Sequence, residues 1–115
     1  MHQLFKCLLL SFGFTAVGLM ANPTAEQVEF FEKNIRSVLA EHCYECHSQD
    51  IKQPKGGLRL DHRTAMLRGG DRGPAIVPGQ PDQSLVIQAV RHESLEMPPQ
   101  GKLSDGVIAD LVKWI

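Results

Sequence analysis

The strongest constraint on this chain is a pair of cysteines three residues apart, Cys43 and Cys46, followed directly by His47. The chain has 115 residues and three cysteines in all, which suits one small domain but not a scaffold built on several disulfides. Aromatic residues make up only 6% of the sequence, so its own side chains provide little bulk for a core. A domain of this kind usually needs a covalently held or bound group. The sequence therefore predicts that the cysteine pair helps to hold such a group.

The first 21 residues have the features of a secretory signal peptide. Lys6 supplies a positive charge, an uncharged and mostly apolar run extends from Cys7 to Met20, and Ala21 offers a small residue for cleavage. The run is shorter than the roughly 20 apolar residues of a membrane span. We therefore expect export to the periplasm or an equivalent extracytoplasmic compartment, with a domain over residues 22–115. A retained N-terminal anchor is the alternative.

Apolar residues at helical spacing predict a helix near each end of this domain. The first helix is expected over 24–42, where Thr24 and Gln27 have the spacing of a capping box. Ser104 is expected to cap the last helix. The apolar stripes of the two helices consist of Val28, Phe31, Ile35, Val38 and Leu39, and of Val107, Ile108, Leu111, Trp114 and Ile115. We expect the two helices to cross and to bury Phe31 and Trp114 near each other.

The chain between these helices is rich in glycine and proline. Helical turns are expected over 63–68, and a helix is expected from Pro81 to about His92. The segment 97–101 is predicted to be a stiff loop, because it contains two consecutive prolines. The net charge of −1 argues against a strongly basic nucleic-acid binder.

The sequence Cys43-Tyr44-Glu45-Cys46-His47 has the Cys-x-x-Cys-His spacing of covalent haem attachment. Two thiols at this spacing can each bond one haem vinyl group, and the imidazole of the next residue can bind the iron. A thioredoxin-like redox pair, a zinc site that includes His42 and a plain disulfide are the alternatives. The first lacks a βαβ context, the second would strain a tetrahedron with adjacent ligands, and the third closes a very small ring. Haem attachment is therefore favoured.

A second axial ligand of the iron is expected elsewhere in the chain. After removal of the signal peptide, the remaining methionines are Met66 and Met97. Met97 is favoured because its proline-containing loop can hold a thioether in place, whereas Met66 is expected to fill the core. His62, His92 or an open position are the alternatives, although each of these histidines lies beside an arginine and is expected to be exposed. His42 is expected to be a solvated helix residue.

The order and spacing of three stretches resemble a known family. The stretches are FFEKNIRSVLAEHCYECHS, KGGLRLDHRTAMLRGGDRGPAIVPGQPDQSLVIQAVRHESLEMPP and GKLSDGVIADLVKWI, and they cover about residues 28–115. They resemble the planctomycete-type cytochrome c domain, within the class I cytochrome c fold. The resemblance implies an all-α fold around one haem c, bound through Cys43 and Cys46, with His47 and Met97 as axial ligands.

The resemblance also implies one-electron transfer, with a redox partner protein or a downstream domain as the partner. In that family the domain typically opens a longer exported protein, so an electron-entry module is an alternative description. An open sixth position would instead suit peroxide chemistry or gas binding. No stop signal precedes Ile115, and we expect the last helix to be truncated there. No nucleic-acid partner is expected, and no membrane span unless the N-terminal segment is retained.

Two further expectations concern the surroundings of the haem. Class I cytochromes orient the proximal imidazole with a backbone carbonyl near a proline, for which the segments 73–74 and 77–79 are the candidates here. The segment 50–72 is expected to be a solvated loop. The functional alternative is that its basic residues pair with haem propionates or attract an acidic redox partner. These basic residues are Lys52, Lys55, Arg59, Arg63, Arg68 and Arg72.

Overall fold

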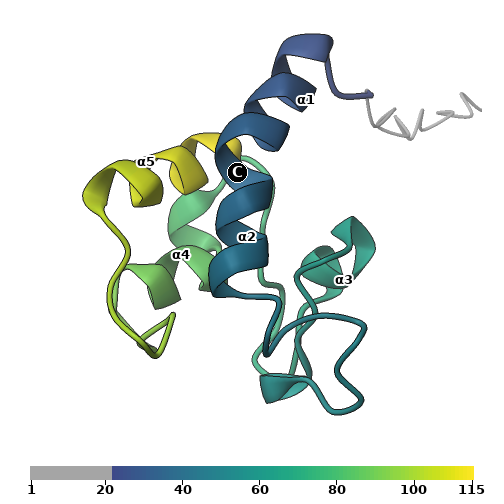
Figure 1. Cartoon of the computed structure of the whole chain (residues 1–115), viewed down its shortest axis with the longest axis vertical. Helices are drawn as coiled ribbons and strands as arrows, with labels where there is room; N and C mark the ends of the chain where they lie inside the picture. The colour runs from purple at the N-terminus through teal and green to yellow at the C-terminus, as the bar shows by residue number, and fades with distance from the viewer. Residues whose placement is uncertain (1–21) are drawn as a thin grey trace, which may run out of the picture.

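The computed structural model describes residues 22–115, and the predicted signal peptide lies outside these residues. The described chain is helical and contains no strand, apart from an isolated bridge between Gly70 and Gly73. The predicted all-α class is therefore confirmed for this part of the chain (Figure 1). The elements are α1 (Ala25–Phe30), the π-helical η1 (Phe31–Ile35), α2 (Arg36–His42), the 3₁₀ turn η2 (Lys55–Gly57), α3 (Arg63–Arg68), the 3₁₀ turn η3 (Pro81–Gln83), α4 (Leu85–Val90) and α5 (Asp105–Trp114).

The segments α1, η1 and α2 follow one another without a break and form the predicted N-terminal helix. Its capping box is present, because the Gln27 amide donates to Thr24 Oγ1 at 3.2 Å and the Thr24 amide donates to Gln27 Oε1 at 2.8 Å. The π turn in its middle was not predicted. The expected place of Val28 in the apolar stripe is wrong, since its side chain is 44% exposed. The reason is that α5 packs against η1, and α1 extends beyond this contact (Figure 1).

The core lies where the N-terminal helix, α4 and α5 meet. The ring centroids of Phe31 and Trp114 are 5.6 Å apart, and the Asn34 side-chain amide donates to Asp110 Oδ2 at 3.1 Å. These contacts join η1 to α5, and α4 packs in turn on α5 (Figure 1). The side chains that are almost fully buried in this region are Ile35, Leu39, Ile87 and Leu111.

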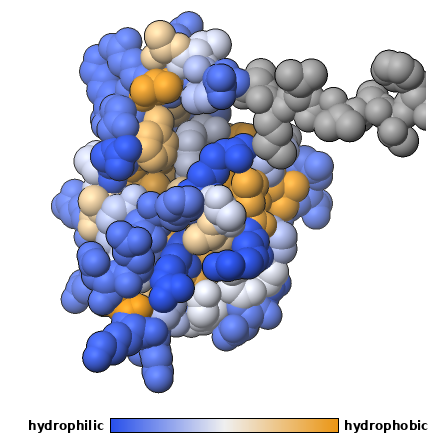
Figure 2. Space-filling view, turned by 90° about the vertical axis from the view of Figure 1, so that its right-hand side faces the viewer, coloured by the Kyte–Doolittle hydropathy of each residue, from blue (hydrophilic) through white to orange (hydrophobic). Residues whose placement is uncertain are grey.

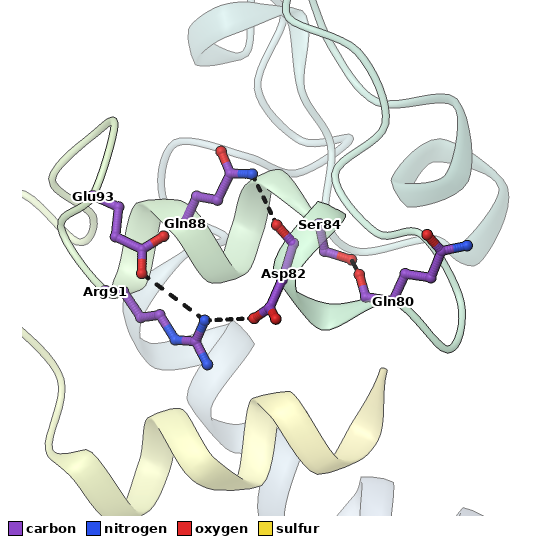
Figure 3. Close-up of polar contacts among 6 residues, drawn as sticks. All are labelled: Gln80, Asp82, Ser84, Gln88, Arg91 and Glu93. Carbon is purple, nitrogen blue, oxygen red and sulfur yellow. Dashed lines mark hydrogen bonds and ion pairs between the residues drawn. The ribbon is translucent and has the colours of Figure 1, made fainter.

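The helix predicted over 81–92 is divided at Ser84 into η3 and α4. Ser84 has an extended backbone, with φ −87° and ψ 120°, and it is fully buried. Its hydroxyl accepts from the Val77 amide at 2.9 Å and donates to the Gln80 carbonyl at 2.9 Å (Figure 3). The prediction of one continuous helix is therefore wrong, because the side chain bonds backbone groups outside the helix.

The segment 48–79 runs mainly in turns and contains the predicted helical piece α3, which buries Ala65 and Met66. The predicted loop over 97–101 is also present without helix. The surface mixes polar residues with small apolar patches, including a narrow apolar strip over α1 (Figure 2). Within residues 22–115, no helix has both the length and the apolar character needed to cross a membrane.

Candidate functional site

The residues Cys43 to His47 form a tight turn at the end of α2. The Cys43 amide still bonds the Leu39 carbonyl at 2.9 Å, as in the helix. The amides of Cys46 and His47 then both donate to the Cys43 carbonyl, at 3.2 and 2.9 Å. Both cysteines are free and half-buried. A single turn therefore presents two thiols and one imidazole, as covalent haem attachment requires.

The His47 ring is oriented by the backbone of Leu58. Its Nδ1 lies 3.2 Å from the Leu58 carbonyl oxygen, and because a carbonyl can only accept, Nδ1 carries the proton. The lone pair of the neutral ring is then on Nε2. Histidines that bind metals are commonly held in this way. The donor set of this turn therefore fits a haem iron.

The acceptor of this hydrogen bond differs from the predicted one. The segments 73–74 and 77–79 were expected to supply it, but Leu58 does so. The chain after the cysteine turn folds back across it, with the Lys55 amide donating to the Cys46 carbonyl at 3.1 Å and the Leu60 amide to the His47 carbonyl at 2.8 Å. Because residues 55–60 fold back in this way, the Leu58 carbonyl lies beside the His47 ring, and no proline is needed.

The environment of Cys43 bears on the alternatives to haem. Cys43 packs against the apolar core, and burial raises the pKa of its thiol to about 11. Redox-active cysteines instead have thiols with lowered pKa values, so this environment disfavours a thioredoxin-like pair. Among residues 22–115, no three His, Cys, Asp or Glu side chains are grouped as a metal site, and the ligands of a structural zinc site are thus not assembled in this part of the chain.

Met97 lies in the segment between α4 and α5. It is half-buried, and its amide donates to the Ala89 carbonyl, the acceptor at the end of α4, at 3.2 Å. Its neighbour Pro98 lines a surface hollow of about 380 Å³ together with His42, the residue before Cys43. Met66, by contrast, is 5% exposed and lies in the core, as predicted. The loop of Met97 and the last residue of α2 therefore border the same surface hollow.

Among the histidines outside the cysteine turn, His92 departs from expectation. His42 and His62 are exposed, as predicted. His92 is half-buried, has a left-handed backbone with φ 60°, and has a buried Nε2 with no hydrogen-bond partner. Its amide donates at 3.0 Å to the Ala89 carbonyl, which also accepts from Met97. The predicted exposure of His92 is wrong because the turn that ends α4 encloses it.

The basic segment forms a second hollow, of about 360 Å³, between Gln49 and α3. Within it, Arg59 Nε and Asp61 Oδ1 are buried without a partner, while Asp61 Oδ2 accepts from the Gln49 amide at 2.8 Å. An unpaired buried guanidinium nitrogen is suited to an anionic group such as a propionate. The other basic residues of the segment are exposed, as predicted, and are Lys52, Lys55, Arg63, Arg68 and Arg72.

The model of one protein family, described as Planctomycete cytochrome C, matches residues 43–101. The chain belongs to the planctomycete cytochrome C family. The match begins at the first cysteine of the turn and ends at Gly101, the last residue of the loop of Met97. It is narrower than the resemblance noted from the sequence, since α1, η1, α2 and α5 lie outside it.

Membership of the cytochrome C family indicates a haem-binding domain of the electron-transfer type. The two cysteines at the start of the matched region have the spacing of covalent haem attachment. No curated protein and no solved structure matches the chain. The family assignment therefore rests on residues 43–101, and the roles of single residues rest on their chemistry and surroundings.

Proposed function

We propose that this domain is a one-electron carrier with one covalently attached haem c. Cys43 and Cys46 would hold the haem through thioether bonds, and His47 Nε2 and the Met97 thioether would be its axial ligands. The haem, when bound, supplies an iron that alternates between the ferrous and ferric states. The observation that carries this proposal is the hydrogen bond from His47 Nδ1 to the Leu58 carbonyl, because it leaves Nε2 free within a Cys-x-x-Cys-His turn.

The remaining residues of the site support a carrier more than a catalyst. With both axial positions filled, no position is left on the iron for a substrate. Ligation by a methionine raises the reduction potential relative to two histidines. Burial of Cys43 and Met66 beside the core would place the haem against apolar side chains, which a domain with few aromatics needs. Arg59, with its unpaired Nε, is a candidate partner for a haem propionate.

The proposed compartment of the domain rests on its family and on its N-terminal segment. Cytochrome c domains are typically extracytoplasmic, and the first 21 residues have the composition of a secretory signal. We therefore place the domain in the periplasm or an equivalent compartment. Its partner would be a redox protein or a downstream domain of the same exported protein.

The test is a visible spectrum of the oxidised and reduced protein, exported in a host with c-type haem maturation. An alkaline pyridine haemochrome identifies covalent haem, and the methionine–iron absorption band of the oxidised protein identifies the sixth ligand. The band should disappear in Met97→Ala and persist in the control Met66→Leu, which keeps the volume of a buried side chain. Absence of covalent haem would refute the proposal and return the cysteines to thiol chemistry.

One observation favours His92 over Met97 as the sixth ligand of the iron. The buried and unpaired Nε2 of His92 belongs to a residue that shares the Ala89 carbonyl with Met97. If His92 binds the iron, Met97→Ala leaves the spectrum unchanged and His92→Ala alters it. If neither variant alters the spectrum, and carbon monoxide binds the ferrous wild-type protein readily, the sixth position is open and peroxide or gas chemistry is favoured.

A further inference from the structure

We propose that Gly70 is a positioning residue for His47. The turn at residues 69–73 sets the place of the Leu58 carbonyl, and through it the hydrogen bond on the His47 ring and the reduction potential of the haem. This inference rests on the proposed function, since it takes His47 as the proximal ligand. It adds a turn that acts on His47 through the backbone of residues 56–58.

The first step is the contact between the two glycine turns. The Asp71 amide donates to the Gly56 carbonyl at 2.9 Å. A Cβ atom at Gly70 would lie 2.2 Å from that same carbonyl oxygen and 3.1 Å from the Leu58 amide nitrogen. Both neighbours are backbone atoms, so an alanine could be accommodated only by moving the backbone of residues 56–58 or of the 69–73 turn.

The second step is the stiffness of each turn. The Gly57 amide bonds the Pro54 carbonyl at 3.0 Å, and the Leu58 amide bonds the Lys55 carbonyl at 3.2 Å, so residues 54–58 form a closed turn. On the other side, Gly70 and Gly73 exchange backbone hydrogen bonds of 3.3 and 3.1 Å. Movement at Gly56 is therefore transmitted to Leu58 and is not absorbed by a flexible loop.

The third step is the effect on the ring. A hydrogen bond from Nδ1 to a carbonyl increases the basicity of a metal-bound imidazole. A more basic imidazole favours the ferric over the ferrous state and so lowers the reduction potential. Displacing the Leu58 carbonyl from its 3.2 Å contact weakens this bond. The potential should then rise, and the Nδ1 proton should exchange with solvent more rapidly.

The experiment compares Gly70→Ala with wild type as the haem-loaded protein. Redox titration gives the potential, and NMR of the ferrous form gives the exchange rate of the His47 Nδ1 proton. The matched control is Gly79→Ala, because Gly79 has φ 76° with no atom within 4 Å of an added Cβ. This control introduces backbone strain in a loop that bonds Ile115 and not the residues around His47.

We expect Gly70→Ala to raise the potential and to speed proton exchange by about fivefold to tenfold, the effect of weakening one hydrogen bond. Gly79→Ala should lower stability without either change. A potential and an exchange rate in Gly70→Ala equal to those of wild type or of Gly79→Ala would overturn the proposal. Wild-type protein without covalent haem would instead overturn the proposed function, and this inference with it.

Gly57→Ala keeps the proposal testable if Gly70→Ala does not fold. An added Cβ at Gly57, which has φ 64°, would meet the Asp71 side-chain oxygen at 2.9 Å. This atom is the end of a side chain that can rotate, so the disturbance of the same contact is milder. The left-handed backbone of Gly57 also strains the 54–58 turn that carries Leu58, so the potential should rise, though less than with Gly70→Ala. An unchanged potential and exchange rate would refute the proposal.

Discussion

The helical part of this domain and the segment 48–79 are stabilised in different ways. In the helical part, side chains from η1, α2, α4 and α5 make up most of the core, to which Leu60, Met66, Ala75 and Ile76 of the segment 48–79 also contribute, so the size of each buried side chain matters. In the segment 48–79, backbone hydrogen bonds between turns predominate, and two glycines allow close approach where any side chain would collide. The two parts lie side by side, with α3 and its loops beside the lower end of α2 (Figure 1).

His47 lies at the boundary between these two parts. The turn at the end of α2 carries it, and the backbone of Leu58 orients it. The comparison teaches that the helical part carries His47 while the backbone of the segment 48–79 orients its ring; in the proposed function, the first would supply the ligand and the second would tune it. The predictions below test whether the two parts respond to substitution as differently as this division implies.

The largest effect is expected from removing a core side chain in the helical part. Leu111 in α5 is 2% exposed, and replacing it with alanine should lower the free energy of unfolding by about 2–5 kcal/mol. Denaturation of the haem-loaded protein with guanidinium chloride measures this change. The control Val28→Ala, at a site 44% exposed, should change it by less than about 0.5 kcal/mol. Equal effects at the two sites would show that the helical part is not held by buried side chains.

The second prediction concerns an added atom in the segment 48–79. A Cβ at Gly69 would lie 1.8 Å from the Gly73 carbonyl oxygen, and Gly69 has φ 76°. We expect Gly69→Ala to lower the free energy of unfolding by about 2–3 kcal/mol, from backbone strain and displacement together. Gly73→Ala separates these causes, because Gly73 has φ 111° but open space around an added Cβ; it should cost about 1 kcal/mol. A loss no greater at Gly69 than at Gly73 would argue against close packing of this turn.

The third prediction tests a residue that joins the two parts. The Ser84 hydroxyl, at the start of α4, bonds the Val77 amide and the Gln80 carbonyl. Ser84→Ala leaves the Val77 amide without this partner, and it should cost about 1–3 kcal/mol. The exposed Ser94 provides a control, with Ser94→Ala expected to change stability by less than about 0.5 kcal/mol. If the two variants are equally stable, water replaces the hydroxyl at Val77 and the junction depends on packing instead.

The sequence predicted the helical part better than the segment 48–79, for a physical reason. Helical periodicity and capping residues are local signals, and they predicted the ends of the first helix. They also predicted Ser104 as the cap of α5, and its hydroxyl accepts from the Val107 amide at 3.3 Å. The π turn η1 escaped prediction because it changes the spacing of an apolar stripe by only one residue. Val28 was misplaced because α5 packs mainly against η1, which helical periodicity does not reveal.

In the candidate site, the cysteine turn was predictable because its chemistry lies in five consecutive residues. The acceptor for His47 was not predictable, since any residue has a carbonyl and only the folded path selects Leu58. The glycine pairs at 56–57 and 69–70 were the available clue, as they mark places where backbones approach closely. His92 was misjudged because its left-handed turn has no sequence signature. The ligation by Met97 stays a prediction.

The smallest expected effect has the opposite sign and tests glycine in the helical part. Gly106 lies in the first turn of α5, and no atom lies within 4 Å of an added Cβ. Gly106→Ala should therefore raise the free energy of unfolding by up to about 1 kcal/mol, since alanine is the better helix former. The reverse change at an exposed position of the same helix, Ala109→Gly, should lower it by a similar amount. A destabilised Gly106→Ala variant would mean that this glycine, like those of the segment 48–79, is required by a close approach, and the division between the two parts would then fail at α5.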